Sequence, residues 1–143
     1  MKKYIAYGSN INMEWMKEAC PSSELVGSGY ILNAKLLFRG KGHLNLVLGP
    51  GYGKVPVSIW NINEENEKAL DEYEDYPSYY VKKNILVLGD KGIEEGMVYV
   101  MTNELKDIKK APRDSYVKRV LDGFEHMSYD KKPIEDALEE VCK

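Results

Sequence analysis

Six short runs rich in β-branched and aromatic residues recur along the chain, and they constrain its fold more than any other feature. Such residues favour extended strands, and the runs are separated by turn-forming residues or by segments with helical spacing. Six strands of this length predict a mixed sheet or a small, partly closed β-barrel. We expect the strands at residues 4–7, 30–38, 44–48, 55–60, 79–88 and 96–101.

Helical patterns fall between and after these runs. The first follows a capping candidate and stops at Pro21, and the second opens with Asn63, another good cap. The last two keep apolar residues at helical spacing, which is typical of helices packed on a sheet. The sequence therefore predicts an α+β fold with flanking short helices, and its length fits one domain, 1–143. We expect the helices at residues 12–20, 63–74, 116–124 and 134–141.

Charge and composition exclude several classes of function. A net charge of −3 gives no general attraction to nucleic acid or anionic lipid, and no run reaches the roughly 18 apolar residues of a membrane helix. Cys20 and Cys142 are too few for a disulfide framework, and His43 and His126 stand apart from other metal-ligating residues. We expect a cytoplasmic protein with a small-molecule partner and no nucleic-acid, membrane or metal partner. The oligomeric state is left open.

The glycine-rich segment 49–54 ends in Gly-Lys and invites comparison with a phosphate-binding loop. That loop needs four residues between its outer glycines, a Ser or Thr after the lysine, and a following helix. Here only three residues separate Gly49 from Gly53, Val55 follows Lys54, and the next segment has a strand pattern. The segment is therefore interpreted as a turn between two strands.

The run Tyr7-Gly8-Ser9-Asn10 lies where a predicted strand ends and a predicted helix is about to begin. Gly8 permits the sharp turn that this position requires. Backbone N–H groups in such a loop lack helical partners, so they suit a carboxylate or a developing oxyanion. A simpler alternative is that Ser9, Asn10 or Asn12 only caps the helix.

The run from Leu70 to Tyr80 crosses from the last turn of a predicted helix to the start of a strand, and Pro77 enforces the exit. Four carboxylates gather there, at Asp71, Glu72, Glu74 and Asp75, with tyrosines at 73, 76, 79 and 80. The helix dipole and like-charge neighbours disfavour ionisation, so at least one of these carboxylates is expected to have a raised pKa suited to general-base work. Alternatively, they are solvated side chains beside ordinary rim tyrosines.

Together the two runs resemble the γ-glutamyl cyclotransferase superfamily, which includes AIG2-like proteins and bacterial γ-glutamylamine cyclotransferases. Its first hallmark, Tyr-Gly-Ser-Asn, stands unchanged at residues 7–10. Its second is Leu-Asp, two variable residues, a catalytic Glu-Gly and a tyrosine a few positions later, and it appears at Leu70-Asp71 with Glu74 and Tyr80. Two departures are that Asp75 replaces the glycine after the glutamate and that Val57 stands where many relatives have glycine. The second departure is expected to reshape the floor of the pocket.

The resemblance implies a cofactor-independent transferase in which the substrate's α-amine attacks its own γ-carbonyl and releases 5-oxoproline. Glu74 would be the catalytic proton acceptor, and no metal is implied. The substrate-binding residues implied are Tyr7, Gly8, Ser9, Asn10, Ile11 and Tyr80. Arg39 is a further candidate for a substrate carboxylate, or else part of a surface ion pair. The alternatives are a non-catalytic small-molecule-binding module on the same fold, suggested by Asp75, and removal of a γ-glutamyl protecting group in a biosynthetic pathway.

Overall fold

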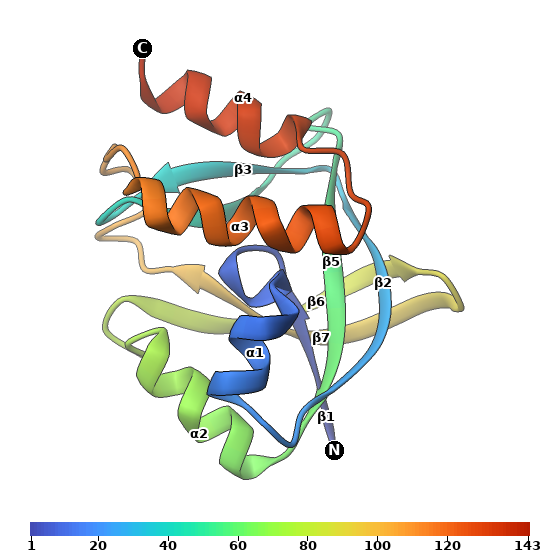
Figure 1. Ribbon diagram of the computed structural model, residues 1–143. Coiled ribbons are helices and arrows are strands. Elements are labelled where there is room, and N and C mark those ends of the chain that lie inside the picture. Colours follow the sequence, from blue (N-terminus) through green and yellow to red (C-terminus); the bar gives the residue numbers. More distant parts are fainter.

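The computed structural model describes residues 1–143 and is built around a closed five-stranded barrel (Figure 1). The neighbours around the barrel pair antiparallel, except for one parallel bridge between Tyr4 and Met97 that closes it. The predicted α+β class with a small barrel is thus confirmed. In barrel order the strands are β1 (Lys2–Ala6), β5 (Lys54–Ile62), β2 (Glu24–Leu32), β6 (Tyr80–Gly89) and β7 (Gly92–Met101).

A separate hairpin and four helices cover parts of the barrel. The hairpin pairs β3 (Ala34–Arg39) with β4 (His43–Leu48). Figure 1 shows α3 and α4 on the same side of the molecule as β3, with α1 and α2 toward the opposite end. A short 3-10 turn, η1 (Ser9–Ile11), follows β1 and packs against α3. The helices are α1 (Met13–Ala19), α2 (Glu64–Tyr73), α3 (Asp114–His126) and α4 (Lys132–Val141).

The prediction of one strand over residues 30–38 is wrong, because β2 and β3 are separate strands. The chain turns at Asn33, whose φ of 54° is left-handed and ends the extended run. β2 also begins earlier than expected, at Glu24. The sequence pattern missed this part of the strand because its glycines weaken the strand signal. Gly29 is required by close approach: a Cβ there would lie 2.6 Å from the carbonyl oxygen of Leu88 on β6.

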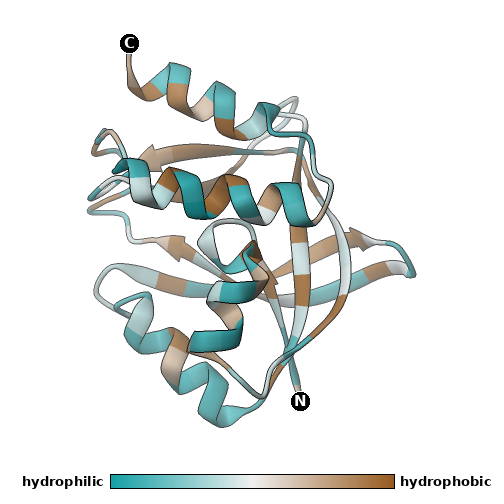
Figure 2. Cartoon of the chain, viewed as in Figure 1, coloured by the Kyte–Doolittle hydropathy of each residue, from teal (hydrophilic) through white to brown (hydrophobic).

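The barrel strands supply most of the core. On β5, every residue from Val55 to Trp60 is buried, so both faces of this strand are covered, and α2 and β3 contact it. Figure 2 shows apolar and polar residues alternating along α3 and α4, as expected for helices with one buried side. The glycine-rich segment 49–54 joins β4 to β5 as a turn, which confirms its interpretation. No helix in the structure has the length and apolarity needed to cross a membrane.

Candidate active site

A cavity of about 230 Å³ lies where the loop after β1 meets the C-terminal end of α2. The wall also includes residues from β4, from β7 and from the start of α3. Tyrosine dominates this wall, so the interior combines aromatic surface with hydroxyl groups. The tyrosines are Tyr4, Tyr7, Tyr73, Tyr79, Tyr80, Tyr99 and Tyr116.

The loop after β1 presents backbone donors to this cavity. Gly8, Ser9 and Asn10 all line it, and their N–H groups donate to no acceptor within the protein. The next two amides are engaged in η1, because Ile11 donates to the Gly8 carbonyl at 3.1 Å and Asn12 to the Ser9 carbonyl at 3.0 Å. Three adjacent free donors form a small anion-binding cradle.

Capping of α1 is carried out by a residue outside this cradle. The Asn12 side-chain oxygen Oδ1 accepts the N–H of Trp15 at 3.1 Å, which caps the helix. Ser9 and Asn10 are therefore not used as caps. The Ser9 hydroxyl instead lies 2.9 Å from the Tyr73 hydroxyl, so it joins the loop to the end of α2.

Glu74 caps the C-terminus of α2 and turns its carboxylate toward the loop. Its backbone N–H donates to the Leu70 carbonyl at 2.8 Å, which continues the helical pattern by one residue. Its Oε1 accepts a hydrogen bond from Asn10 Nδ2 at 3.3 Å. Burial of the carboxylate raises its pKa from the usual 4.5 to about 8, and the Asn10 hydrogen bond lowers it by a smaller amount. The group is thus poised to exchange a proton near neutral pH.

Asn10 has a second feature that bears on the site. Its Nδ2 also donates to the Tyr4 hydroxyl at 2.7 Å. Its carbonyl oxygen Oδ1 is buried and has no partner in the protein. A buried unpaired acceptor costs free energy, so it favours a ligand that brings a donor.

Asp75, which stands where glycine was expected, has a φ of 52°. This left-handed conformation is freely available to glycine and, among other residues, is most accessible to Asn and Asp. Asp75 is exposed at the edge of the cavity, and its carbonyl accepts the N–H of Tyr79 at 2.8 Å. The backbone therefore makes the turn without glycine, and Glu74 still faces Asn10.

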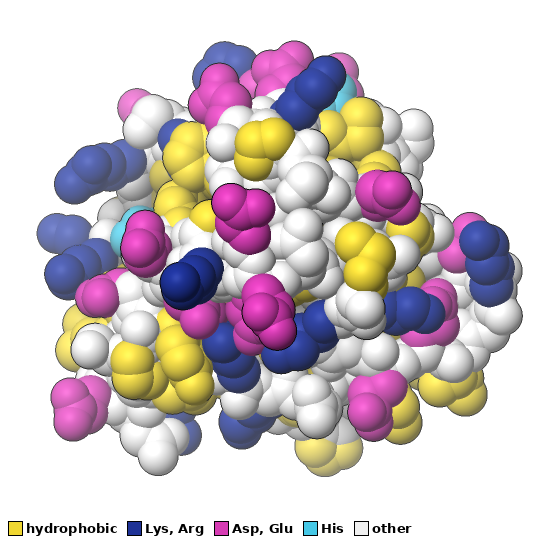
Figure 3. Space-filling view, turned by 90° about the horizontal axis from the view of Figure 1, so that it is seen from below, with side chains coloured by type: hydrophobic (Ala, Val, Ile, Leu, Met, Phe, Trp, Pro, Cys, Tyr) yellow, Lys and Arg dark blue, Asp and Glu magenta, His cyan; other side chains and the backbone are white.

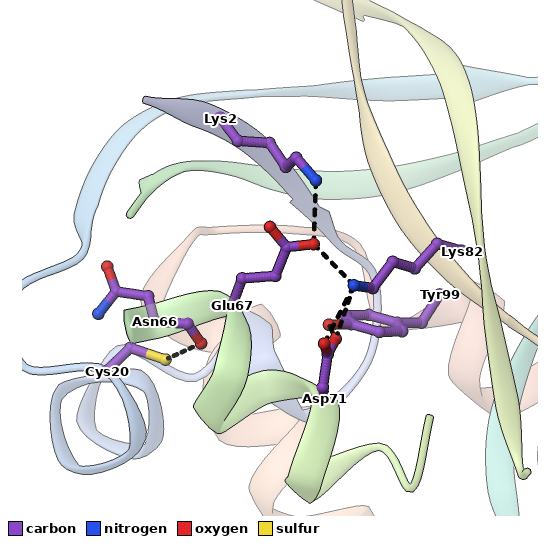
Figure 4. A network of polar contacts seen from close by, with 7 residues as sticks. All are labelled: Lys2, Cys20, Asn66, Glu67, Asp71, Lys82 and Tyr99. Carbon is purple, nitrogen blue, oxygen red and sulfur yellow. Dashed lines mark hydrogen bonds and ion pairs between the residues drawn. The ribbon is translucent and has the colours of Figure 1, made fainter. Parts of the chain in front are cut away.

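A polar network anchors α2 to the barrel behind the cavity (Figure 4). The Tyr99 hydroxyl donates to Asp71 at 2.6 Å, and Lys82 Nζ donates to Asp71 at 3.1 Å and to Glu67 at 2.7 Å. Lys2 on β1 also donates to Glu67, at 2.9 Å. Tyr99 is both a cavity wall residue and a partner of Asp71. The network fixes the helix that carries Glu74 relative to the wall opposite it.

With this geometry in view, the chain can be compared with known proteins. The family described as gamma-glutamyl cyclotransferase, AIG2-like, matches residues 4–118. The chain belongs to this family. Comparison with curated proteins gives no match.

Several solved structures share the fold of this AIG2-like protein. A structure named gamma-glutamyl cyclotransferase is 24% identical, with a TM-score of 0.81, covering 95% of this chain and 85% of its own. An uncharacterised human protein is also 24% identical, with a TM-score of 0.80 and coverage of 99% and 98%. An AIG2-like protein from mouse is 20% identical, with a TM-score of 0.63 and coverage of 80% and 89%.

The structure brings most of the sequence-predicted residues of this family member together. Tyr7 lines the cavity, with its hydroxyl donating to the Tyr99 carbonyl at 2.7 Å. Tyr80 lines it too, but its hydroxyl donates to the Leu44 carbonyl at 2.8 Å, so its oxygen is left to accept. Ile11 lies behind the wall, because its side chain is buried in the core and its N–H is engaged.

The structure also decides one open alternative and corrects one expectation. Arg39 lies outside the cavity and forms a two-point ion pair with Glu140 at 2.8 and 2.9 Å, which is the ion-pair alternative. Val57 does not form the cavity floor, since it is buried within β5 and is absent from the wall.

Several wall residues escaped the sequence reasoning. The Tyr4 hydroxyl accepts from Asn10, and the Tyr116 hydroxyl accepts the Leu44 N–H at 3.1 Å, so both keep a proton to donate to a ligand. His43 lies against Tyr79, whose hydroxyl is 2.8 Å from Nδ1. One available signal was the ratio of 11 Tyr to 2 Phe, which indicates that most aromatic positions need a hydroxyl.

Proposed function

We propose that this AIG2-like protein is a cyclotransferase that acts on γ-glutamyl amines or γ-glutamyl peptides. The substrate's α-amine attacks its own γ-carbonyl, and 5-oxoproline leaves together with an amine or amino acid. The observation that carries the proposal is the Glu74 carboxylate, which has a pKa of about 8 and faces the free amides of residues 8–10 across one cavity. Family membership supports the same reaction class.

The cavity suits the first task, which is to fold the glutamyl chain. Its volume of about 230 Å³ accommodates a group of amino-acid size. Holding the amine against the carbonyl turns the reaction into a well-oriented intramolecular step, for which effective molarities reach about 10⁵–10⁸ M. The Asn10 Oδ1 acceptor is suited to an N–H of the substrate amine.

Glu74 supplies the proton transfers. The α-amine of a γ-glutamyl group lies beside a free carboxylate, which raises its pKa above the value of about 8 found for a peptide amine, so it is largely protonated at neutral pH and cannot attack. Because the pKa of Glu74 is raised to about 8, its carboxylate accepts that proton at a much smaller cost in free energy than an ordinary glutamate would. The neutral amine then forms the new C–N bond, and the γ C–N bond breaks as Glu74 returns the proton to the departing nitrogen. No water is consumed.

The loop amides take the charge that develops. Attack on the γ-carbonyl creates an oxyanion, and the N–H groups of Gly8, Ser9 and Asn10 are placed to stabilise it or to hold the α-carboxylate. The Tyr116 hydroxyl is a further donor, since a Cβ built on Gly8 would lie only 3.4 Å from its oxygen. The Tyr116 hydroxyl is held in place by the Leu44 N–H, which it accepts.

The geometry of the site bears differently on the two alternatives to this proposal. A non-catalytic module was suggested by Asp75, but its left-handed backbone substitutes for glycine, and this favours the enzyme. Removal of a γ-glutamyl protecting group uses the same ring closure and differs only in the amine expelled. We also propose a cytoplasmic location, with which the free thiols of Cys20 and Cys142 agree.

The test is product analysis in water enriched in ¹⁸O. Purified protein is incubated with γ-glutamyl substrates, and products are identified by mass spectrometry. We expect unlabelled 5-oxoproline in equal amount to the released amine, and none from Glu74→Gln. Labelled glutamate in place of the lactam would indicate hydrolysis, and equal turnover by Glu74→Gln would remove the proposed base.

A further inference from the structure

Where the β3–β4 turn and the segment before α3 border the cavity, two basic side chains stand without an acidic partner. Lys41 lines the cavity, and Arg113 precedes α3; both are exposed and neither forms an ion pair. We call this pair the cationic rim. Figure 3 shows basic side chains gathered along its left edge, the side on which β3 ends and α3 begins in Figure 1.

Chain packing holds the two rim residues close to the wall. The turn between β3 and β4 carries Lys41, and the segment before α3 lies directly on it, since the Gly40 N–H donates to the Ile108 carbonyl at 2.8 Å. A Cβ on Gly42 would lie 2.7 Å from the carbonyl oxygen of Ala111, so the two segments are in close contact. The Lys41 N–H itself donates to the Tyr79 hydroxyl of the wall at 2.7 Å.

The positive charges of the cationic rim act on His43, a residue of the cavity wall. Burial lowers the pKa of His43, and the charges of Arg113 and Lys41 lower it further. His43 is therefore a neutral wall residue beside two cations, and the free amides of residues 8–10 add partial positive charge. The carboxylates of the wall, Glu74 and Asp75, come from the end of α2 rather than from the rim.

We propose that the cationic rim selects γ-glutamyl substrates whose expelled amine carries an anionic group, a carboxylate or a phosphate. This inference rests on the proposed function, because it assigns the part of the substrate that leaves. The reacting amine must lie at Glu74, and a cavity of about 230 Å³ holds little beyond the glutamyl group. The remainder of the substrate then extends to the exposed mouth, where Lys41 meets it.

The experiment compares three substrates whose leaving amines are similar in size but differ in charge. They are γ-glutamylglycine, γ-glutamylpropylamide and γ-glutamyl-1,2-diaminoethane, which are anionic, neutral and cationic in the leaving part. We measure kcat/KM for 5-oxoproline release at low and high ionic strength. The proteins are the parent, Lys41→Gln, Arg113→Gln, and Lys91→Gln as a matched control in the distant β6–β7 turn.

We expect the anionic substrate to be preferred by on the order of fivefold to tenfold per unit of charge, with a preference that shrinks in salt. Lys41→Gln and Arg113→Gln should lower kcat/KM mainly for γ-glutamylglycine. Lys91→Gln should leave the order of the three kcat/KM values unchanged. An equal loss for all three substrates would overturn the inference, because the rim would then bind the shared glutamyl half. Equal kcat/KM values for the three substrates in the parent protein would overturn the inference as well.

A failure of the proposed function gives a different result. If no substrate yields 5-oxoproline, the cyclotransferase assignment fails, and calorimetric affinities of the same three compounds decide the inference. Tighter binding of γ-glutamylglycine that weakens in Lys41→Gln supports the rim as the selective element. Equal affinities overturn it.

Discussion

Replacing Glu74 with glutamine should stabilise the protein at alkaline pH while it removes activity. The raised pKa means that the folded state holds the Glu74 proton more tightly than the unfolded chain does. Below pH 4.5 the carboxyl is neutral in both states and costs nothing. As the pH rises from 4.5 toward 8, the unfolded state gains stability by ionising while the folded state does not, so the free energy of unfolding falls. Glutamine keeps the shape and lacks this cost.

The size of the effect follows from the same pKa. Moving a carboxyl from 4.5 to about 8 corresponds to a cost of about 5 kcal/mol once the group is ionised in both states. Glu74 is partly exposed, and water near the carboxylate reduces that cost. We therefore expect the free energy of unfolding of Glu74→Gln to exceed that of the parent protein by about 2–4 kcal/mol at pH 9. At pH 5 the two values should differ by under about 1 kcal/mol.

The assay is urea unfolding at pH 5, 7 and 9, analysed for the free energy of unfolding and its slope. Glu72→Gln is the control, because it removes the same charge from an exposed site on the same helix. The difference in free energy of unfolding between Glu74→Gln and the parent protein should grow as the pH rises. The difference between Glu72→Gln and the parent should show no such growth. A separation that is the same at pH 5 and pH 9 would refute the reasoning.

Three further changes probe the surroundings of Glu74. Asp75→Gly relieves a φ of 52° but loosens the unfolded chain, so stability should change by less than about 1 kcal/mol and turnover should persist; lost turnover would implicate the Asp75 side chain. Tyr99→Phe deletes the 2.6 Å hydrogen bond to Asp71 and should cost about 1–2 kcal/mol in urea unfolding, with unchanged stability as the contrary result. Gly8→Ala places a methyl group 3.4 Å from the Tyr116 hydroxyl, so KM should rise while Tm barely moves; a parental KM would contradict this.

Local patterns were enough to predict much of the fold. Alternation and composition located most strands, and Asn63 caps α2 as expected, with its side chain accepting the Asn66 N–H at 2.8 Å. The break at Asn33 and the early start of β2 were missed. The early part of β2 pairs with β5, and at Asn33 the chain leaves β5 to enter the hairpin with β4. Both features depend on pairing between strands that are distant in sequence, which leaves no local signal.

The residues of the candidate site likewise fall into those that local sequence could predict and those that it could not. The loop at residues 7–10 and Glu74 are contiguous motifs, so their spacing could indicate them. Tyr4, Tyr99 and Tyr116 come from three separate elements, and only the barrel closure and the packing of α3 bring their rings to one wall. Ile11 illustrates the converse, because the family resemblance implied a backbone contact with the substrate, whereas in the 3-10 turn its N–H is bound to the Gly8 carbonyl.

The pH dependence of kcat/KM for 5-oxoproline release is the most direct measurement of the role given to Glu74. For the parent protein, activity should rise with pH through an apparent pKa near 8, as the carboxylate that accepts the substrate proton forms, and should fall at higher pH as the free substrate amine loses that proton. Glu74→Gln should release no measurable 5-oxoproline at any pH. If that variant retained turnover with the parental profile, another group would be accepting the proton and the central claim would be wrong.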